Sequence, residues 1–179
     1  RILALRVLRR HGADVLAITG PFLHDPSPQV RREVALFLQD PAEMGPAYLV
    51  GDQRPASQAL IQSLVELAKQ YDGKDRWYLS ALGSAARGRE DALFAQLREV
   101  YQGTHNQALV ALLWELRPKT ALPYLSTAIA DNSLPLADRL NALDALAGMQ
   151  WPDAAAAVEA LILAEDTPAP LLERAFGHY

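Results

Sequence analysis

The residues that could carry chemistry are few, and their spacing forms no known catalytic or metal-binding pattern. The four histidines, at positions 11, 24, 105 and 178, lie far apart. None belongs to a His-x-x-x-His or Glu-x-x-His arrangement that would place two metal ligands on one helix face. No Gly-x-Ser-x-Gly turn presents a serine nucleophile, and no glycine-rich loop is available to hold a phosphate. The sequence therefore predicts no catalytic residue, no metal site and no cofactor in this chain.

The chain contains no cysteine. This excludes disulfides, cysteine-ligated zinc, covalent attachment of c-type haem and a thiol nucleophile within these 179 residues.

Three arginines could present a basic ladder to an acidic partner: Arg31, Arg76 and Arg139. The structural alternative is that each binds a turn aspartate or the exposed carbonyls at a helix end. We expect the structural role, because the three residues lie at the starts of predicted helices, next to such groups.

The three tryptophans, Trp77, Trp114 and Trp151, recur at equal intervals but occupy different positions in their units, which favours core packing. Trp77 and Tyr78 are the exception, because adjacent helical residues point in different directions and cannot both face one core. One of the two is therefore expected at the inner surface. The candidate partner-binding residues are Arg32, Arg76, Trp77 and Tyr78.

Composition and charge argue against two kinds of partner, nucleic acids and the membrane interior. Half of the chain is apolar but only 7% is aromatic, and the abundance of Ala and Leu favours helix. The net charge of −4 and the scattered basic residues argue against a nucleic-acid surface. A DNA glycosylase that uses Trp, Asp and Arg on a concave helical face would need a basic groove, so the charge disfavours that enzyme as well. No apolar stretch approaches the ~20 residues of a membrane-spanning helix, so we expect no membrane insertion.

Helical periodicity between regularly placed glycines and prolines predicts about eleven helices and no strand. A long insertion, residues 40–55, contains prolines, glycines and a short apolar run. Loops of this length in a compact array are functional or packed down by their own apolar residues. The expected helices cover residues 1–10, 14–23, 29–38, 56–71, 74–86, 90–101, 105–116, 119–130, 135–149 and 152–164, and a last one begins near 168.

Internal repetition determines how these helices are organised. Two stretches share an arginine, a small or branched apolar residue, another apolar residue and a leucine at identical offsets: Arg31, Val34, Phe37 and Leu38, and Arg139, Ala142, Ala145 and Leu146. Units of about 30 residues cannot bury their apolar sides alone, so they stack. We predict an all-α, right-handed α-solenoid of about five antiparallel helix pairs. The helices beginning near 1, 28, 74, 105, 135 and 168 would form its concave layer.

The segment from Asp25 through Val30-Arg31 resembles the second half of a HEAT repeat of the phycobilisome-lyase type. The resemblance to HEAT-like arrays covers nearly the whole chain, residues 1–179, as a single domain. It implies that Asp25 and Arg31 pair across the turn. It also implies weaker versions of the same pair, Asp72 with Arg76 and Asp131 with Arg139.

Residues 71–79, followed by Ala81-Leu82-Gly83, are similar to the repeat region of large bacterial proteins described as membrane-bound dehydrogenases or haem-binding c-type cytochromes. The resemblance implies a periplasmic or otherwise exported location and an accessory role beside redox domains that this chain lacks. Arg1 already lies within a helical pattern, so we expect a piece of a larger protein.

These observations predict a non-catalytic interaction or scaffolding domain whose partner is a protein or another domain of the same polypeptide. The alternative is an accessory domain of an oxidoreductase. A third reading, a small-molecule-binding enzyme, would need the 40–55 insertion to cover a pocket.

Overall fold

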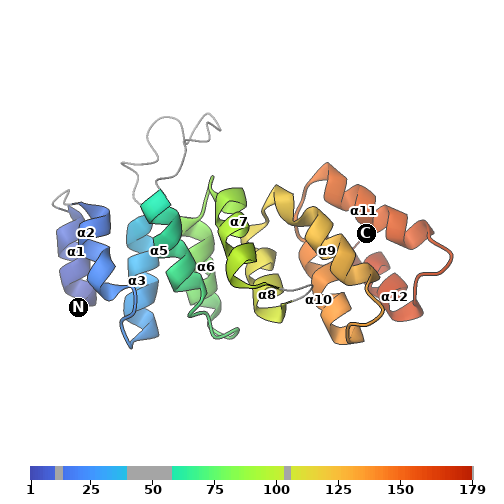
Figure 1. Ribbon diagram of the computed structural model, residues 1–179, viewed down its shortest axis with the longest axis horizontal. Helices are drawn as coiled ribbons and strands as arrows, with labels where there is room; N and C mark the ends of the chain where they lie inside the picture. The colour runs from blue at the N-terminus through green and yellow to red at the C-terminus, as the bar shows by residue number, and fades with distance from the viewer. Residues whose placement is uncertain (11–13, 40–57, 103–105, 179) are drawn as a thin grey trace. The chain divides into compact units, whose positions relative to one another are not determined.

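The computed structural model describes residues 1–10, 14–39, 58–102 and 106–178. These residues form eleven α-helices and two short 3-10 helices, with no strand among them (Figure 1). The prediction of an all-α chain is confirmed for this part of the sequence. The predicted 40–55 insertion lies outside the described residues. None of the described helices has both the length and the apolar character needed to cross a bilayer.

The chain divides into two compact units, residues Arg1–Leu97 and Arg98–Tyr179. In the first unit α3 is the central helix: it packs most extensively against α6 and also contacts α1, α2 and α5. Figure 1 shows α3 between α1 and α6. The core includes Leu5, Val34, Phe37, Leu64 and Leu82, all at most 2% exposed. The helices are α1 (Ile2–Arg10), α2 (Val15–Thr19), η1 (Gly20–Phe22), α3 (Pro28–Leu38), α5 (Gln58–Ala68), α6 (Arg76–Ala85) and the first part of α7 (Glu90–Val100).

The segment predicted as one helix over 14–23 is divided in two. Asp14 caps α2 by accepting hydrogen bonds from the amides of Leu16 and Ala17 at 3.0 and 3.2 Å. The α-helix ends at Thr19, and the 3-10 helix η1 continues with Pro21 near its start. Proline lacks the N–H that would continue the α-helical ladder, and a short 3-10 turn accommodates it.

The second unit is arranged around α10 in the same way. This helix packs most extensively against α9 and also contacts α8, α11 and α12. Asn106 caps α8 with hydrogen bonds from the amides of Ala108 and Leu109. The core includes Leu109, Leu113 and Leu143, each fully buried. The helices are α8 (Gln107–Leu116), η3 (Lys119–Ala121), α9 (Leu122–Ala130), α10 (Leu136–Ala147), α11 (Pro152–Leu163) and α12 (Ala169–His178).

Candidate functional site

Arg31 binds the main chain of the turn before α3. Its Nη1 donates to the carbonyl oxygen of Asp25 at 2.6 Å. The carboxylate of Asp25 instead accepts hydrogen bonds from Arg1 Nη1 at 2.6 Å and from the Ser27 amide at 2.9 Å. The contact between Asp25 and Arg31 that the family resemblance implies is therefore made through the Asp25 carbonyl, while Arg1 and the Ser27 amide bind the carboxylate. This is the structural role that the sequence favoured.

Arg139 occupies the matching position in the second unit and also binds a main-chain carbonyl. Its side chain is buried, and Nε donates to the carbonyl oxygen of Ile129 at 2.8 Å. Asp131 accepts hydrogen bonds from the amide and the hydroxyl of Ser133, at 2.9 and 2.6 Å. Arg31 therefore satisfies a carbonyl of the turn before α3, and Arg139 satisfies a carbonyl in the last turn of α9.

The predicted pair of Asp72 and Arg76 is replaced by other contacts. Asp72 Oδ1 accepts hydrogen bonds from the amides of Lys74 and Asp75 at 2.8 and 3.0 Å. These bonds, chiefly that from Asp75, hold the pKa of Asp72 below its ordinary value of 3.8. The guanidinium carbon of Arg76 lies 5.3 Å from the ring centroid of Trp77, within cation–π range.

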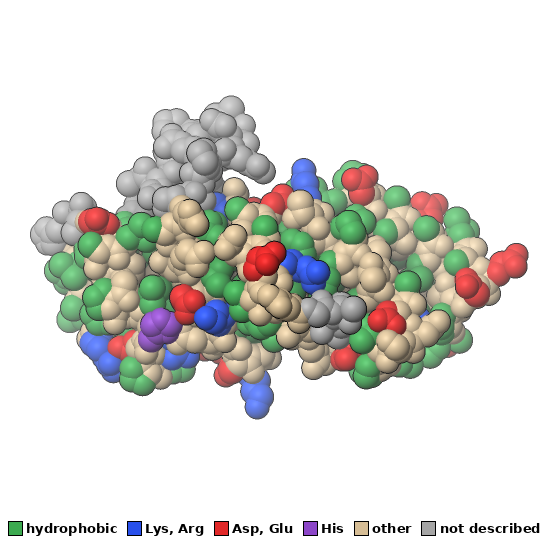
Figure 2. Space-filling view, viewed as in Figure 1, with side chains coloured by type: hydrophobic (Ala, Val, Ile, Leu, Met, Phe, Trp, Pro, Cys, Tyr) green, Lys and Arg blue, Asp and Glu red, His purple; other side chains and the backbone are tan. Residues whose placement is uncertain are grey.

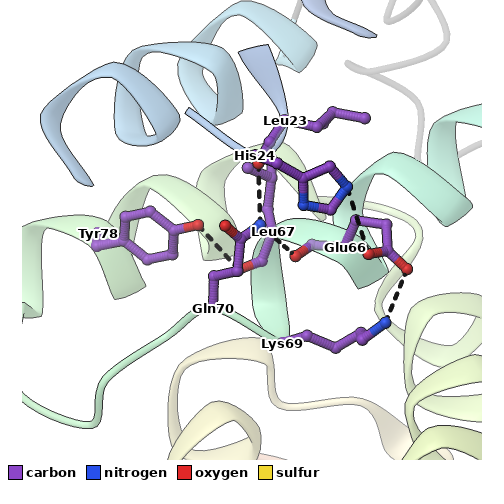
Figure 3. A network of polar contacts seen from close by, with 7 residues as sticks. All are labelled: Leu23, His24, Glu66, Leu67, Lys69, Gln70 and Tyr78. Carbon is purple, nitrogen blue, oxygen red and sulfur yellow. Dashed lines mark hydrogen bonds and ion pairs between the residues drawn. The ribbon is translucent and has the colours of Figure 1, made fainter. Parts of the chain in front are cut away.

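Tyr78 is a structural residue and not the partner-contacting residue that the sequence suggested. Its side chain is 2% exposed, and its hydroxyl donates to the carbonyl oxygen of Leu67 at 2.8 Å. Figure 3 shows Tyr78 bonded to Leu67 in the last turn of α5. Just after this helix, the side-chain amide of Gln70 donates to the carbonyl of Leu23 at 2.9 Å. Burial raises the pKa of Tyr78 above 10.0, and the nearby Arg31 guanidinium offsets part of this rise.

The remaining contacts in Figure 3 lie at the surface. His24 Nε2 is 3.7 Å from Glu66 Oε2, and Lys69 Nζ is 3.0 Å from Glu66 Oε1. Exposed pairs of this kind contribute little to stability because water and salt screen them. They place a small charged cluster beside the buried hydrogen bonds of Tyr78 and Gln70.

Trp77, next to Tyr78 in the sequence, is 65% exposed. It lines an open cavity of about 470 Å³ between α3 and α6, which we call the α3–α6 groove. The other lining residues are Arg32 and Leu36 from α3, and Ser80, Ala81 and Ser84 from α6. Of the predicted partner-binding residues, Arg32 and Trp77 line this groove directly, and Arg76 stacks on the Trp77 ring.

Helix geometry explains why these residues share one surface. Positions 77, 80, 81 and 84 follow the three- and four-residue spacing of a single face of α6, and positions 32 and 36 are one turn apart on α3. The opposite face of α6 carries the buried Leu82 and Ala85. The small side chains of Ser80, Ala81 and Ser84 leave the space that forms the groove.

The prediction that Trp114 and Trp151 pack in the core is wrong: they are 48% and 37% exposed. Each lies at a helix end, where neighbouring helices cover only part of the ring. Cations cover another part. Arg117 Cζ is 6.0 Å from the Trp114 centroid and Lys119 Nζ is 4.2 Å from the Trp151 centroid. The Trp151 indole N–H also donates to the carbonyl of Arg117 at 3.3 Å.

A second cavity, of about 340 Å³, lies in the second unit, lined by Ala147, Gln150, Trp151, Pro152, Ala155, Val158 and His178. His178 Nε2 is 2.7 Å from Asp144 Oδ1, and Arg174 Nη1 is 3.6 Å from Asp144 Oδ2. None of these lining residues carries a hydroxyl or a thiol.

The surface charges and the possible metal ligands of the described residues bear on what the groove can bind. On the face shown in Figure 2, the Lys and Arg side chains of the described residues are interspersed with acidic and neutral ones. Within the described residues, no group of three or more His, Asp or Glu side chains is placed to hold a metal ion. An exposed indole beside two guanidinium groups suits binding by contact, through aromatic packing and charged hydrogen bonds.

Comparison with family models, with curated proteins and with solved structures produced no match to this chain. The resemblance to HEAT-like repeats and to the repeat region of bacterial dehydrogenases therefore stays a prediction from the sequence.

Proposed function

We propose that this chain is a protein-interaction or scaffolding domain that acts by contact rather than by catalysis, and that the α3–α6 groove receives a segment of its partner. One observation carries the proposal: Trp77 leaves 65% of its side chain in water beside an open groove. A large aromatic side chain held at a concave surface together with arginine is the composition typical of protein-binding hot spots. The other face of the same helix buries its apolar residues fully.

A HEAT-like solenoid is the architecture we propose for the chain. In the first unit α3 contacts both α1 and α6, and in the second unit α10 contacts both α8 and α12. This is the side-by-side packing of equivalent helices that a stacked array requires. Arg31 and Arg139 each bind a main-chain carbonyl that precedes their own helix, in the turn before α3 and in the last turn of α9, and this similarity supports the repeat derived from the sequence.

The test is affinity capture with the full chain, its Trp77→Ala variant and a matched Trp114→Ala variant. Both tryptophans are exposed, so their replacement should leave the fold intact, which circular dichroism checks. We expect a partner protein to be retained by the wild type and by Trp114→Ala and to be lost with Trp77→Ala. Equal retention by all three proteins, or substrate turnover by the isolated chain, would overturn the proposed function.

A further inference from the structure

Two positive charges lie at the α3–α6 groove, and no carboxylate among the described residues is paired with either of them. Arg32 lines the groove, and Arg76 stacks on its tryptophan, Trp77. Neither guanidinium forms an ion pair or a hydrogen bond with any described carboxylate. Acidic residues outnumber basic ones, 21 to 17, so carboxylates are not scarce in this protein.

Neighbouring arginines show that the fold pairs guanidinium groups where they serve structure. Arg6 makes two parallel hydrogen bonds to Glu33, at 2.8 and 2.9 Å, which join α1 to α3. Arg1 reaches Asp25 at 2.6 Å. Glu33 follows Arg32 directly in the sequence, yet its carboxylate points to Arg6. The Arg32 guanidinium is therefore not paired with Glu33, and Arg32 lines the groove.

The two acidic residues nearest to Arg76 in sequence are engaged by the main chain. Asp72 accepts two amide hydrogen bonds in the turn before α6. Asp75 caps the helix by accepting hydrogen bonds from the amides of Trp77 and Tyr78, both at 3.0 Å. Their carboxylates are thereby held against the main chain and do not form a pair with the Arg76 guanidinium.

We propose that the segment bound in the α3–α6 groove is an acidic, extended peptide of a partner protein. This inference rests on the proposed function. The carboxylates of the bound peptide would pair with Arg32 and Arg76, whose planar guanidinium groups match carboxylate geometry. An apolar or aromatic side chain of the peptide would pack on Trp77 and Leu36.

The shape of the groove agrees with an extended segment. Ser80, Ala81 and Ser84 form a run of small residues that lets a peptide backbone approach α6, and the two hydroxyls can hydrogen-bond to it. A volume of about 470 Å³ accommodates a few side chains. A nucleic acid also carries negative charge, but two arginines at the groove of a chain with a net charge of −4 do not form the concentrated basic surface that phosphate backbones require.

The experiment selects short random peptides on the immobilised full chain and removes those that also bind the Trp77→Ala variant. The expected result is a set of Trp77-dependent peptides enriched in Asp and Glu beside an aromatic or aliphatic residue. Trp77-dependent peptides without this enrichment would overturn the acidic occupant and leave the proposed function standing. The absence of any Trp77-dependent peptide would overturn both.

Charge reversal then tests the two arginines on one selected peptide. Arg32→Glu and Arg76→Glu should each weaken binding about tenfold or more, because a lost charged hydrogen bond leaves the carboxylate unpaired. Arg117→Glu is the matched control, since Arg117 also lies near an exposed tryptophan but outside the groove, and it should leave binding unchanged. Equal weakening by all three variants, or tighter binding of oligothymidylate than of the peptide, would overturn the inference.

Discussion

At the scale of single residues, Trp77 and Tyr78 show how adjacent positions acquire opposite roles. Successive residues of a helix point about 100° apart, so one of them can face the core while the next faces solvent. Tyr78 is 2% exposed and donates to the Leu67 carbonyl, whereas Trp77 is 65% exposed. The Tyr78 hydroxyl thus has a hydrogen-bond acceptor, the Leu67 carbonyl, inside the first unit. The Trp77 ring lies against Arg76 and lines the groove.

Tyr78→Phe should lower the free energy of unfolding by about 1 kcal/mol at neutral pH, because it deletes a buried hydrogen bond. The pKa of Tyr78 is raised above 10.0 in the folded chain, so its stabilising contribution is complete below pH 10.0 and is lost as the pH rises through the folded-state pKa. The advantage of the wild type over Tyr78→Phe should therefore shrink above pH 10.0. Urea unfolding of both proteins across that range measures it, and a constant difference at every pH would contradict the assignment.

At the scale of elements, the start of α6 matters most, because its first turn carries Arg76 and Trp77. Asp75 caps this turn with two hydrogen bonds of 3.0 Å. Asn106 caps α8 in the second unit with equivalent bonds of 3.0 and 3.2 Å. The two caps have similar geometry, but only that of α6 holds the edge of the groove.

Asp75→Ala should cost about 1 kcal/mol of stability, the usual cost of losing a side-chain N-cap. It should also speed amide hydrogen exchange in the first turn of α6 and weaken any Trp77-dependent binding. Asn106→Ala is the control: it should cost a similar amount while leaving exchange in α6 unchanged. Hydrogen exchange read by mass spectrometry separates the two, and unchanged exchange in the Asp75→Ala variant would show that the cap does not hold the turn.

At the scale of the whole molecule, the chain contains two compact units, each with its own core around one central helix. Leu64 in the first unit and Leu143 in the second are both fully buried. In a proposed array of stacked units, each unit is stabilised by its own core and its nearest neighbours. A substitution that removes packing in one unit should then destabilise mainly that unit.

Leu143→Ala should lower stability by about 3 kcal/mol through lost burial and the cavity left behind. It should reduce amide protection in residues 106–178 more than in residues 1–97, and Leu64→Ala should do the reverse. Native-state hydrogen exchange of both variants provides the measurement. A uniform loss of protection along the chain in either variant would indicate one cooperative core and contradict the array.

The positions of most helices could be predicted from the sequence, because helical hydrogen bonds and caps join residues close along the chain. The expected 90–101 and 105–116 correspond to α7 (Glu90–Val100) and α8 (Gln107–Leu116). Of the four predicted partner-binding residues, Arg32 and Trp77 line the groove, Arg76 stacks on Trp77, and Tyr78 is buried. Whether they bind a partner stays a prediction.

Burial and the choice of partner were decided only by the tertiary structure. The prediction that Trp114 and Trp151 pack in the core was wrong. Arg31 does contact Asp25 across the turn, but only the tertiary structure decided that the acceptor is the main-chain carbonyl. Whether a ring is covered depends on which distant helix packs over it, and a guanidinium binds whichever acceptor the packing brings near. The sequence by itself determined the positions of the helices, because these depend on local periodicity. The groove exists because α3 and α6, far apart along the chain, pack side by side.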